Sequence, residues 1–128
     1  MRGSHLLAHW SSTQATVALS SAEAELNALI KATSETLGIM NMLQAMGKEF
    51  ESQIFTDSSA AKGIVHRQGC GKVKHLEARQ LWIQETVEKK IVKVQKVGRE
   101  LNVSDAMTHH WSSIDGSKHF RRAGLEWR

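Results

Sequence analysis

The stretch from Ser20 to Gly47 constrains the fold most, because it carries the start, the apolar face and the end of one long helix. Ser20 can cap the first turn, and Glu23 stands three residues later, where its carboxylate can reach back to the backbone. Gly47 can take the left-handed conformation that ends many helices. Between these signals, apolar residues recur at helical spacing: Ala22, Leu26, Leu29, Ile30, Leu37, Met40 and Leu43. The stretch therefore predicts a helix to about Met46 with one wide apolar face.

Strand signals lie on both sides of this helix. Residues 5–19 alternate at first and then carry β-branched Thr16 and Val17, which predicts a hairpin. Apolar centres predict two further strands, at 52–56 and at 91–97, and the second of these should have one solvated face.

Three more helices are expected, at 60–65, at 74–89 and after Asn102, which can cap the last one. Trp82 and its neighbour Ile83 are expected in the core. The predicted order is β-β-α-β-α-α-β-α, and a chain of 128 residues can bury one modest core. No apolar run approaches the roughly 20 residues of a membrane span, so no membrane partner is expected.

Three acidic residues stand at the edges of these elements. Glu25 is next to Leu26, at the edge of the apolar face, Asp57 follows the strand at 52–56, and Asp105 opens the last helix. A strand that runs into a carboxylate and then a helix resembles a parallel crossover, which places ligands at the carboxyl end of the strand. Carboxylate oxygens are the ligands that Mg²⁺ prefers. Each residue also has an ordinary structural interpretation: a helix surface residue, a turn residue and a residue favoured by the helix dipole.

Five segments together resemble the ribonuclease H domain of copia-type (Ty1/copia) retrotransposon Pol polyproteins. They are residues 10–14 (WSSTQ), 17–26 (VALSSAEAEL), 55–61 (FTDSSAA), 72–79 (KVKHLEAR) and 103–108 (VSDAMT). The resemblance covers a partial RNase H-like domain at 1–111, and residues 112–128 read as a basic C-terminal tail. It implies an α/β fold: an RNase H-like mixed sheet with flanking helices, here lacking the first strand and part of the second.

The resemblance also implies an activity, the metal-dependent hydrolysis of RNA in RNA–DNA hybrids by a ribonuclease H-type endonuclease. Carried over by motif, Glu25, Asp57 and Asp105 are both catalytic residues and ligands for Mg²⁺ or Mn²⁺. The family has a fourth carboxylate on its opening strand, whereas residues 1–22 contain no Asp or Glu. Two-metal hydrolysis needs ions roughly 3.5–4 Å apart, and the absent Asp normally bridges them. The chain therefore resembles an N-terminally truncated domain, and impaired cleavage is expected.

Contacts to nucleic acid are expected from a second set of residues. Ser58 and Ser59 follow Asp57 at a helix start, where they can contact phosphates or only cap the helix. The resemblance implies backbone contacts from the basic group around the helix at 74–89, and a solvated helix face is the structural alternative. That group comprises Lys72, Lys74, His75 and Arg79. A net charge of +4 fits a polyanionic partner but is weak support.

Two other classes of function stay open: a non-catalytic nucleic-acid-binding remnant and a pseudogene product. Loss of the opening strand would expose unpaired backbone groups, so self-association through an exposed sheet edge is also expected. The lone Cys70 excludes an internal disulfide. Together with the short apolar run at the N-terminus, it favours an intracellular location, cytoplasmic or nuclear.

Overall fold

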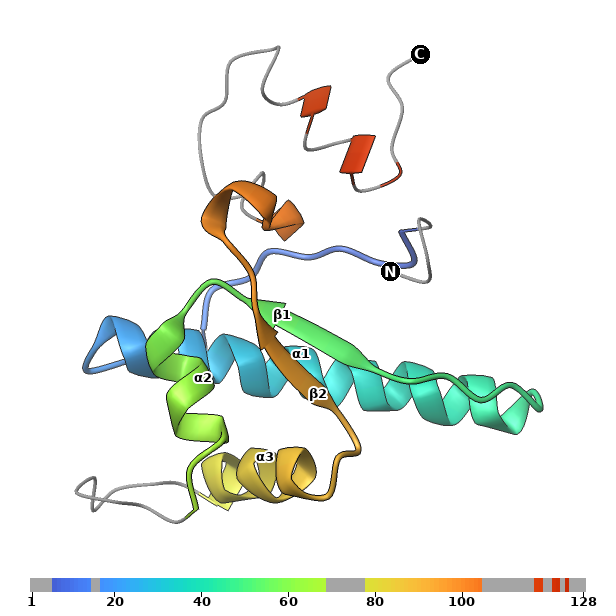
Figure 1. Cartoon of the computed structure of the whole chain (residues 1–128), viewed down its shortest axis with the longest axis horizontal. Coiled ribbons are helices and arrows are strands. Elements are labelled where there is room, and N and C mark those ends of the chain that lie inside the picture. Colours follow the sequence, from blue (N-terminus) through green and yellow to red (C-terminus); the bar gives the residue numbers. More distant parts are fainter. Residues whose placement is uncertain are drawn as a thin grey trace. The chain divides into compact units, whose positions relative to one another are not determined.

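The computed structural model describes residues 6–14, 17–68, 78–104, 117–118, 121–122 and 124. The chain divides into two compact units, one formed by residues 14–97 and the other by 1–13 with 98–128. The first, called the helix–sheet unit below, contains α1 (Ser21–Ala45), β1 (Gln53–Thr56), α2 (Ser59–Val65), α3 (Ala78–Glu88) and β2 (Lys93–Lys96). The other unit contains a short 3₁₀ helix, η1 (Arg99–Leu101). Figure 1 shows these elements.

α1 begins and ends at the predicted signals. The Ser20 hydroxyl accepts the Glu23 backbone N–H at 3.2 Å, and the Glu23 carboxylate reaches back to accept the Leu19 N–H at 2.9 Å. At the other end, Gly47 has φ +74° and donates to the Gln44 carbonyl, while Lys48 donates to the Leu43 carbonyl, both at 2.9 Å. These two bonds form a Schellman motif, which satisfies carbonyls that the helix end would otherwise leave open.

β1 and β2 are parallel neighbours, as the predicted crossover requires. Their register pairs Gln53 with Lys93 and Thr56 with Lys96. The ladder continues at both ends, because the Lys93 N–H donates to Ser52 O at 3.1 Å and the Val97 N–H donates to Thr56 O at 2.9 Å. α2 and α3 form the connection between the two strands. The carboxyl ends of both strands therefore lie at one edge of the sheet.

One buried cluster joins all five elements of the helix–sheet unit. α1 contributes its N-terminal half, and each other element, or the residue just before it, contributes one or two side chains. The members are Leu26, Leu29, Ile30, Ile54, Ala61, Val65, Ile83, Val92 and Val94. In Figure 1, the N-terminal half of α1 passes beside α2 and behind the sheet, whereas its C-terminal half extends past them.

The predicted hairpin at 5–19 is wrong in the part that the structure describes. Residues 6–14 and 17–20 contain no strand, and the side chains of Val17 and Leu19 are 90% and 92% exposed. A hairpin is stable only when its apolar face is covered, and these two side chains remain in solvent. The Gln14 side chain instead donates to the Ala24 carbonyl at 2.7 Å.

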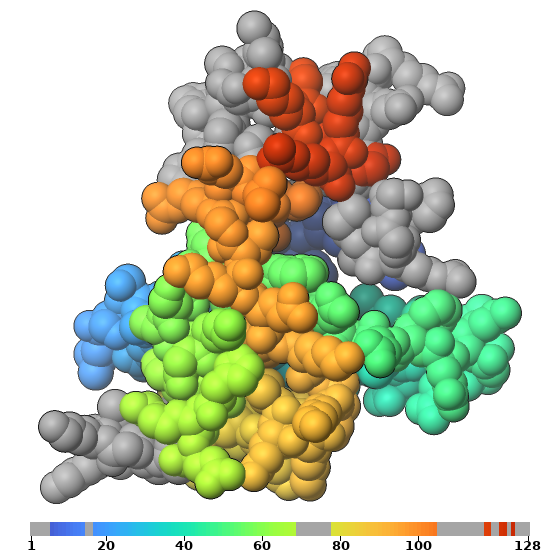
Figure 2. Space-filling view, in the orientation of Figure 1, coloured from blue at the N-terminus to red at the C-terminus, as the bar shows by residue number. Residues whose placement is uncertain are grey.

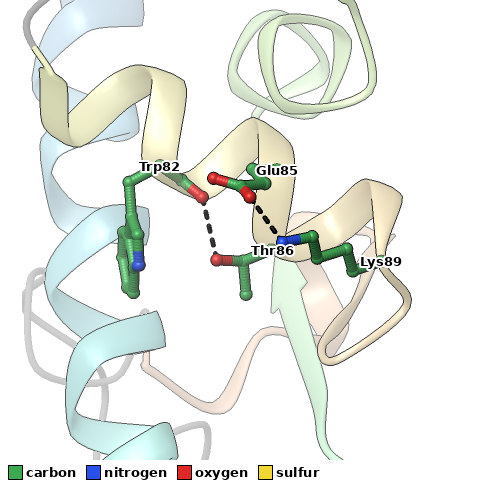
Figure 3. A network of polar contacts seen from close by, with 4 residues as sticks. All are labelled: Trp82, Glu85, Thr86 and Lys89. Carbon is green, nitrogen blue, oxygen red and sulfur yellow. Dashed lines mark hydrogen bonds and ion pairs between the residues drawn. The ribbon is translucent and has the colours of Figure 1, made fainter.

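The prediction for Trp82 is also wrong. Ile83 is fully buried, but Trp82 is 36% exposed. Neighbouring residues on a helix point about 100° apart, so the two side chains do not share one buried direction. Figure 3 shows Trp82 one turn before Thr86, whose hydroxyl donates to the Trp82 carbonyl at 2.8 Å. Beside it, Lys89 donates to Glu85 along the outer face of α3.

The last predicted helix lies mainly outside the described residues. Its capping contact is present, since the Asn102 side chain accepts the Ser104 N–H at 3.2 Å. The structure confirms a mixed α/β fold with a small parallel sheet in the described part of the chain. Within that part, no helix combines the length and the apolar character needed to cross a membrane.

Candidate functional site

Asp57 is held at the carboxyl end of β1 by contacts on both sides. The preceding Thr56 is buried, and its hydroxyl accepts the Ser58 N–H at 3.2 Å. Ser58 caps α2, with its hydroxyl accepting the Ala61 N–H at 3.1 Å. Asp57 itself is half-buried. The strand end and the helix cap thus hold the backbone of Asp57 in place at the sheet edge where ligands of parallel sheets usually bind.

Glu25 is exposed on the second turn of α1, at the edge of the apolar face where the sequence places it. Its neighbour Leu26 is only 2% exposed and belongs to the same buried cluster as Ile54 of β1 and Ala61 of α2. α1 also contacts both of these elements. Packing therefore brings the helical turn that carries Glu25 to the elements that flank Asp57.

Asp105 lies outside the described residues, so the expected meeting of three carboxylates stays a prediction. Within the described ranges, no group of three or more His, Cys, Asp or Glu side chains could hold a metal ion. Glu25 and Asp57 are the two described members of the expected set, and both have polar or electrostatic interactions in the folded chain. Mg²⁺ is commonly held by one or two carboxylates together with waters and substrate phosphates.

Lys96 is a polar neighbour of this sheet edge that the sequence analysis missed. It ends β2 directly opposite Thr56, and its ammonium group donates a hydrogen bond to the Ser59 hydroxyl. The only signal for it in the sequence is its place at the end of the last strand. Once the strands are known to be parallel, that place puts Lys96 beside the start of α2.

The residues predicted to bind nucleic acid are partly described. Ser58 is half-buried and serves as the helix cap, whereas Ser59 is exposed. Arg79 is exposed on the first turn of α3 and has an interaction partner. Lys72, Lys74 and His75 lie outside the described residues. The helix-capping role of Ser58 is thus observed, and the phosphate contacts stay a prediction.

Two ion pairs perturb ionisation away from this edge. A hydrogen bond from Lys93 to Glu51 at 2.7 Å, together with the charge of Lys93, lowers the pKa of the Glu51 carboxyl. Lys89 lowers the pKa of Glu85 in the same way, and Glu85 raises the pKa of Lys89. All of these groups are exposed, so the pairs contribute little to stability.

A cavity of about 410 Å³ lies between the end of α2 and the outer part of α3. Its lining includes the cation Arg67 and the anions Glu85 and Glu88. Neither Glu25 nor Asp57 lines it. The cavity is therefore separate from the candidate site.

Comparison with known proteins gives one informative match. Over 100 residues, 77% of its length, the chain is 31% identical to the "Retrovirus-related Pol polyprotein from transposon TNT 1-94" of Nicotiana tabacum. The chain spans 8% of that polyprotein. No family model and no solved structure matches the chain. The match supports a retrotransposon origin.

Proposed function

We propose that this chain is part of a ribonuclease H-type nuclease domain of a copia-type retroelement. In this proposal Glu25, Asp57 and Asp105 hold Mg²⁺ or Mn²⁺, and the substrate is the RNA strand of an RNA–DNA hybrid. The observation that carries it is the place of Asp57, at the carboxyl end of a parallel strand whose flanking elements pack against the turn of α1 that bears Glu25. The similarity to a transposon Pol polyprotein is independent support.

The donor set suits a hard divalent cation, because both described members are carboxylates and one of them, Glu25, is exposed to solvent. A bound ion would activate the attacking water and stabilise the leaving oxygen. The residues around it would position the hybrid. Ser59 and the ammonium group of Lys96 are hydrogen-bonded at the same sheet edge, where they can meet a phosphate of the backbone.

We further propose that the chain on its own cleaves hybrids slowly. The family's site uses a fourth carboxylate, and residues 1–22 supply none. With fewer anionic oxygens, a pair of cations would repel each other more strongly and would occupy the site less.

A cleavage assay on an RNA–DNA hybrid with Mg²⁺ or Mn²⁺ tests the proposal. Asp57→Asn and Glu25→Gln should each lower the rate by more than the roughly 10–100-fold typical of losing an outer partner of a metal ligand. The matched control is Glu49→Gln, which neutralises an exposed acid outside the proposed site and should leave the rate unchanged. Cleavage that survives Asp57→Asn would contradict the proposed site.

The same preparation separates catalysis from binding alone. If the unaltered chain binds the hybrid in a salt-dependent way but never cleaves it with either metal, the nuclease proposal fails. The non-catalytic alternative would then stand.

A further inference from the structure

α1 carries a second apolar stripe on the side away from the core. Ile39, Met42, Leu43 and Met46 follow the i, i+3, i+4, i+7 spacing of one helix face. At 3.6 residues per turn, this face lies about 140° around the helix from the buried residues of its first half. The side chains of Met42 and Met46 are 57% and 68% exposed. Ile39 and Leu43 are half-buried, but none of the four belongs to the buried cluster, so the stripe is not part of the core.

The position of the stripe leaves room for a partner. All of the fully buried residues of α1 fall between Leu26 and Thr33, and Leu37, just beyond them, packs against the buried cluster while partly exposed. The rest of the helix–sheet unit therefore covers mainly the first half of α1. Figure 2 shows the second half projecting beyond α2 and α3. Residues 36–47 contain no charged side chain. A solvated helix half usually carries charges, and an uncharged one with exposed methionines is typical of a contact surface.

With Glu35 one turn before them, the stripe residues Ile39, Met42 and Met46 have the spacing of a helix-pairing seam. Glu35, Ile39, Met42 and Met46 are separated by four, three and four residues, as a and d positions are in a coiled coil. We propose that the second half of α1 pairs with the same segment of a second copy of this chain, antiparallel and around a twofold axis. In this register Ile39 of each copy faces Met42 of the other, and Glu35 faces Met46.

Charge complementarity favours a second copy as the occupant. In the antiparallel register, Glu35 of one copy lies within two residues of Lys48 of the other, and the twofold axis repeats this ion pair. Both side chains are exposed, and neither has an ion-pair partner among the described residues. No other charge lies between them in the sequence, so the two copies meet without repulsion along the seam.

The expected dimer is weak. A single helix half buries less than the roughly 800 Å² per partner of a standard interface, so the dimer should dissociate on dilution. The surface is also separate from the proposed nuclease site, because Glu35 follows Glu25 by ten residues, about 15 Å along the helix. Loss of the dimer and loss of cleavage are therefore distinct results.

Sedimentation velocity of the full chain over a wide concentration range tests the pairing. Met42→Glu places a charge in the seam and should weaken the dimer by at least about tenfold. The control Asn41→Glu places the same charge on the face of the helix opposite the stripe and should leave the dimer intact. Because both positions are exposed, neither change should unfold the chain, and circular dichroism checks this.

Charge reversal tests the register. Glu35→Lys and Lys48→Glu should each weaken the dimer several-fold, and the double variant should restore it, because both ion pairs are rebuilt with the opposite sign. A chain that stays monomeric at every concentration overturns the proposal. So does a dimer that survives Met42→Glu and is lost in Phe55→Lys, since that result would place the contact on the sheet.

Discussion

Leu26→Ala is the change that most directly tests how α1 is packed. The Leu26 side chain is 2% exposed and belongs to the buried cluster that joins α1 to β1 and α2. The truncation removes three buried carbons, and at about 0.8 kcal/mol each this loses about 2.4 kcal/mol of burial. The cavity left behind adds to this, so the free energy of unfolding should fall by about 3–4 kcal/mol.

Urea unfolding followed by circular dichroism measures this loss, with the slope of the transition checked for constancy. The matched control is Leu19→Ala, which makes the same truncation at a side chain that is 92% exposed, two residues before α1. It should cost no more than about 0.5 kcal/mol. If the two variants lose the same stability, α1 does not pack as described, and the reason for placing Glu25 near Asp57 is refuted.

Three further predictions concern two glycines, a buried hydroxyl and an ion pair. Gly38→Ala should stabilise the chain by about 1 kcal/mol, because Gly38 lies inside α1 with open space around it. Gly47→Ala should destabilise the chain by about 1 kcal/mol, because Gly47 has a positive φ. The melting temperatures of the two variants should therefore shift in opposite directions. Ser52→Ala should raise the free energy of unfolding by up to about 1 kcal/mol, because the buried Ser52 hydroxyl has no hydrogen-bond partner in the described part of the chain. A lower free energy of unfolding, measured by urea unfolding, would contradict this. Lys93 lowers the pKa of Glu51 below its ordinary value of 4.5. The stability that this pair contributes is therefore present above pH 4.5 and is lost as the pH falls through the lowered pKa. The difference in melting temperature between the unaltered chain and Lys93→Met should accordingly disappear in acid.

Local signals in the sequence were enough to predict the elements of the helix–sheet unit. Ser20 and Gly47 mark the two ends of α1 because capping depends only on backbone groups within one turn. The parallel pairing of β1 and β2 could also be predicted, since the strand, the carboxylate and the helices that follow form one crossover.

Features that depend on tertiary contacts were less predictable. Val17 has a high strand propensity, yet it lies in no strand in the described chain, because strand propensity acts through packing and this side chain is not packed. The hydrogen bond between Lys96 and Ser59 depends on the register of two strands far apart in sequence. The sequence pattern assigns Leu43 to the same apolar face as Leu26, and only the burial in the fold shows that the face around Met42 and Met46 lies away from the core.

The candidate site was predictable only where it depends on local sequence. The positions of Glu25 at the edge of a buried face and of Asp57 at a strand end follow from local sequence, and the structure agrees with both. Whether Asp105 joins them depends on contacts between distant parts of the chain, and Asp105 lies outside the described residues. Its role as a ligand stays a prediction.

In the proposed nuclease site, folding brings Glu25 and Asp57 to one divalent cation. Titration of the isotopically labelled chain with Mn²⁺, followed by NMR, tests this arrangement, because the paramagnetic ion broadens the amide signals close to it. We expect the signals around Glu25 and Asp57 to broaden together with one apparent affinity, and both effects to disappear in Asp57→Asn. Broadening at only one of the two positions, or at both with affinities that Asp57→Asn leaves unchanged, would contradict the claim.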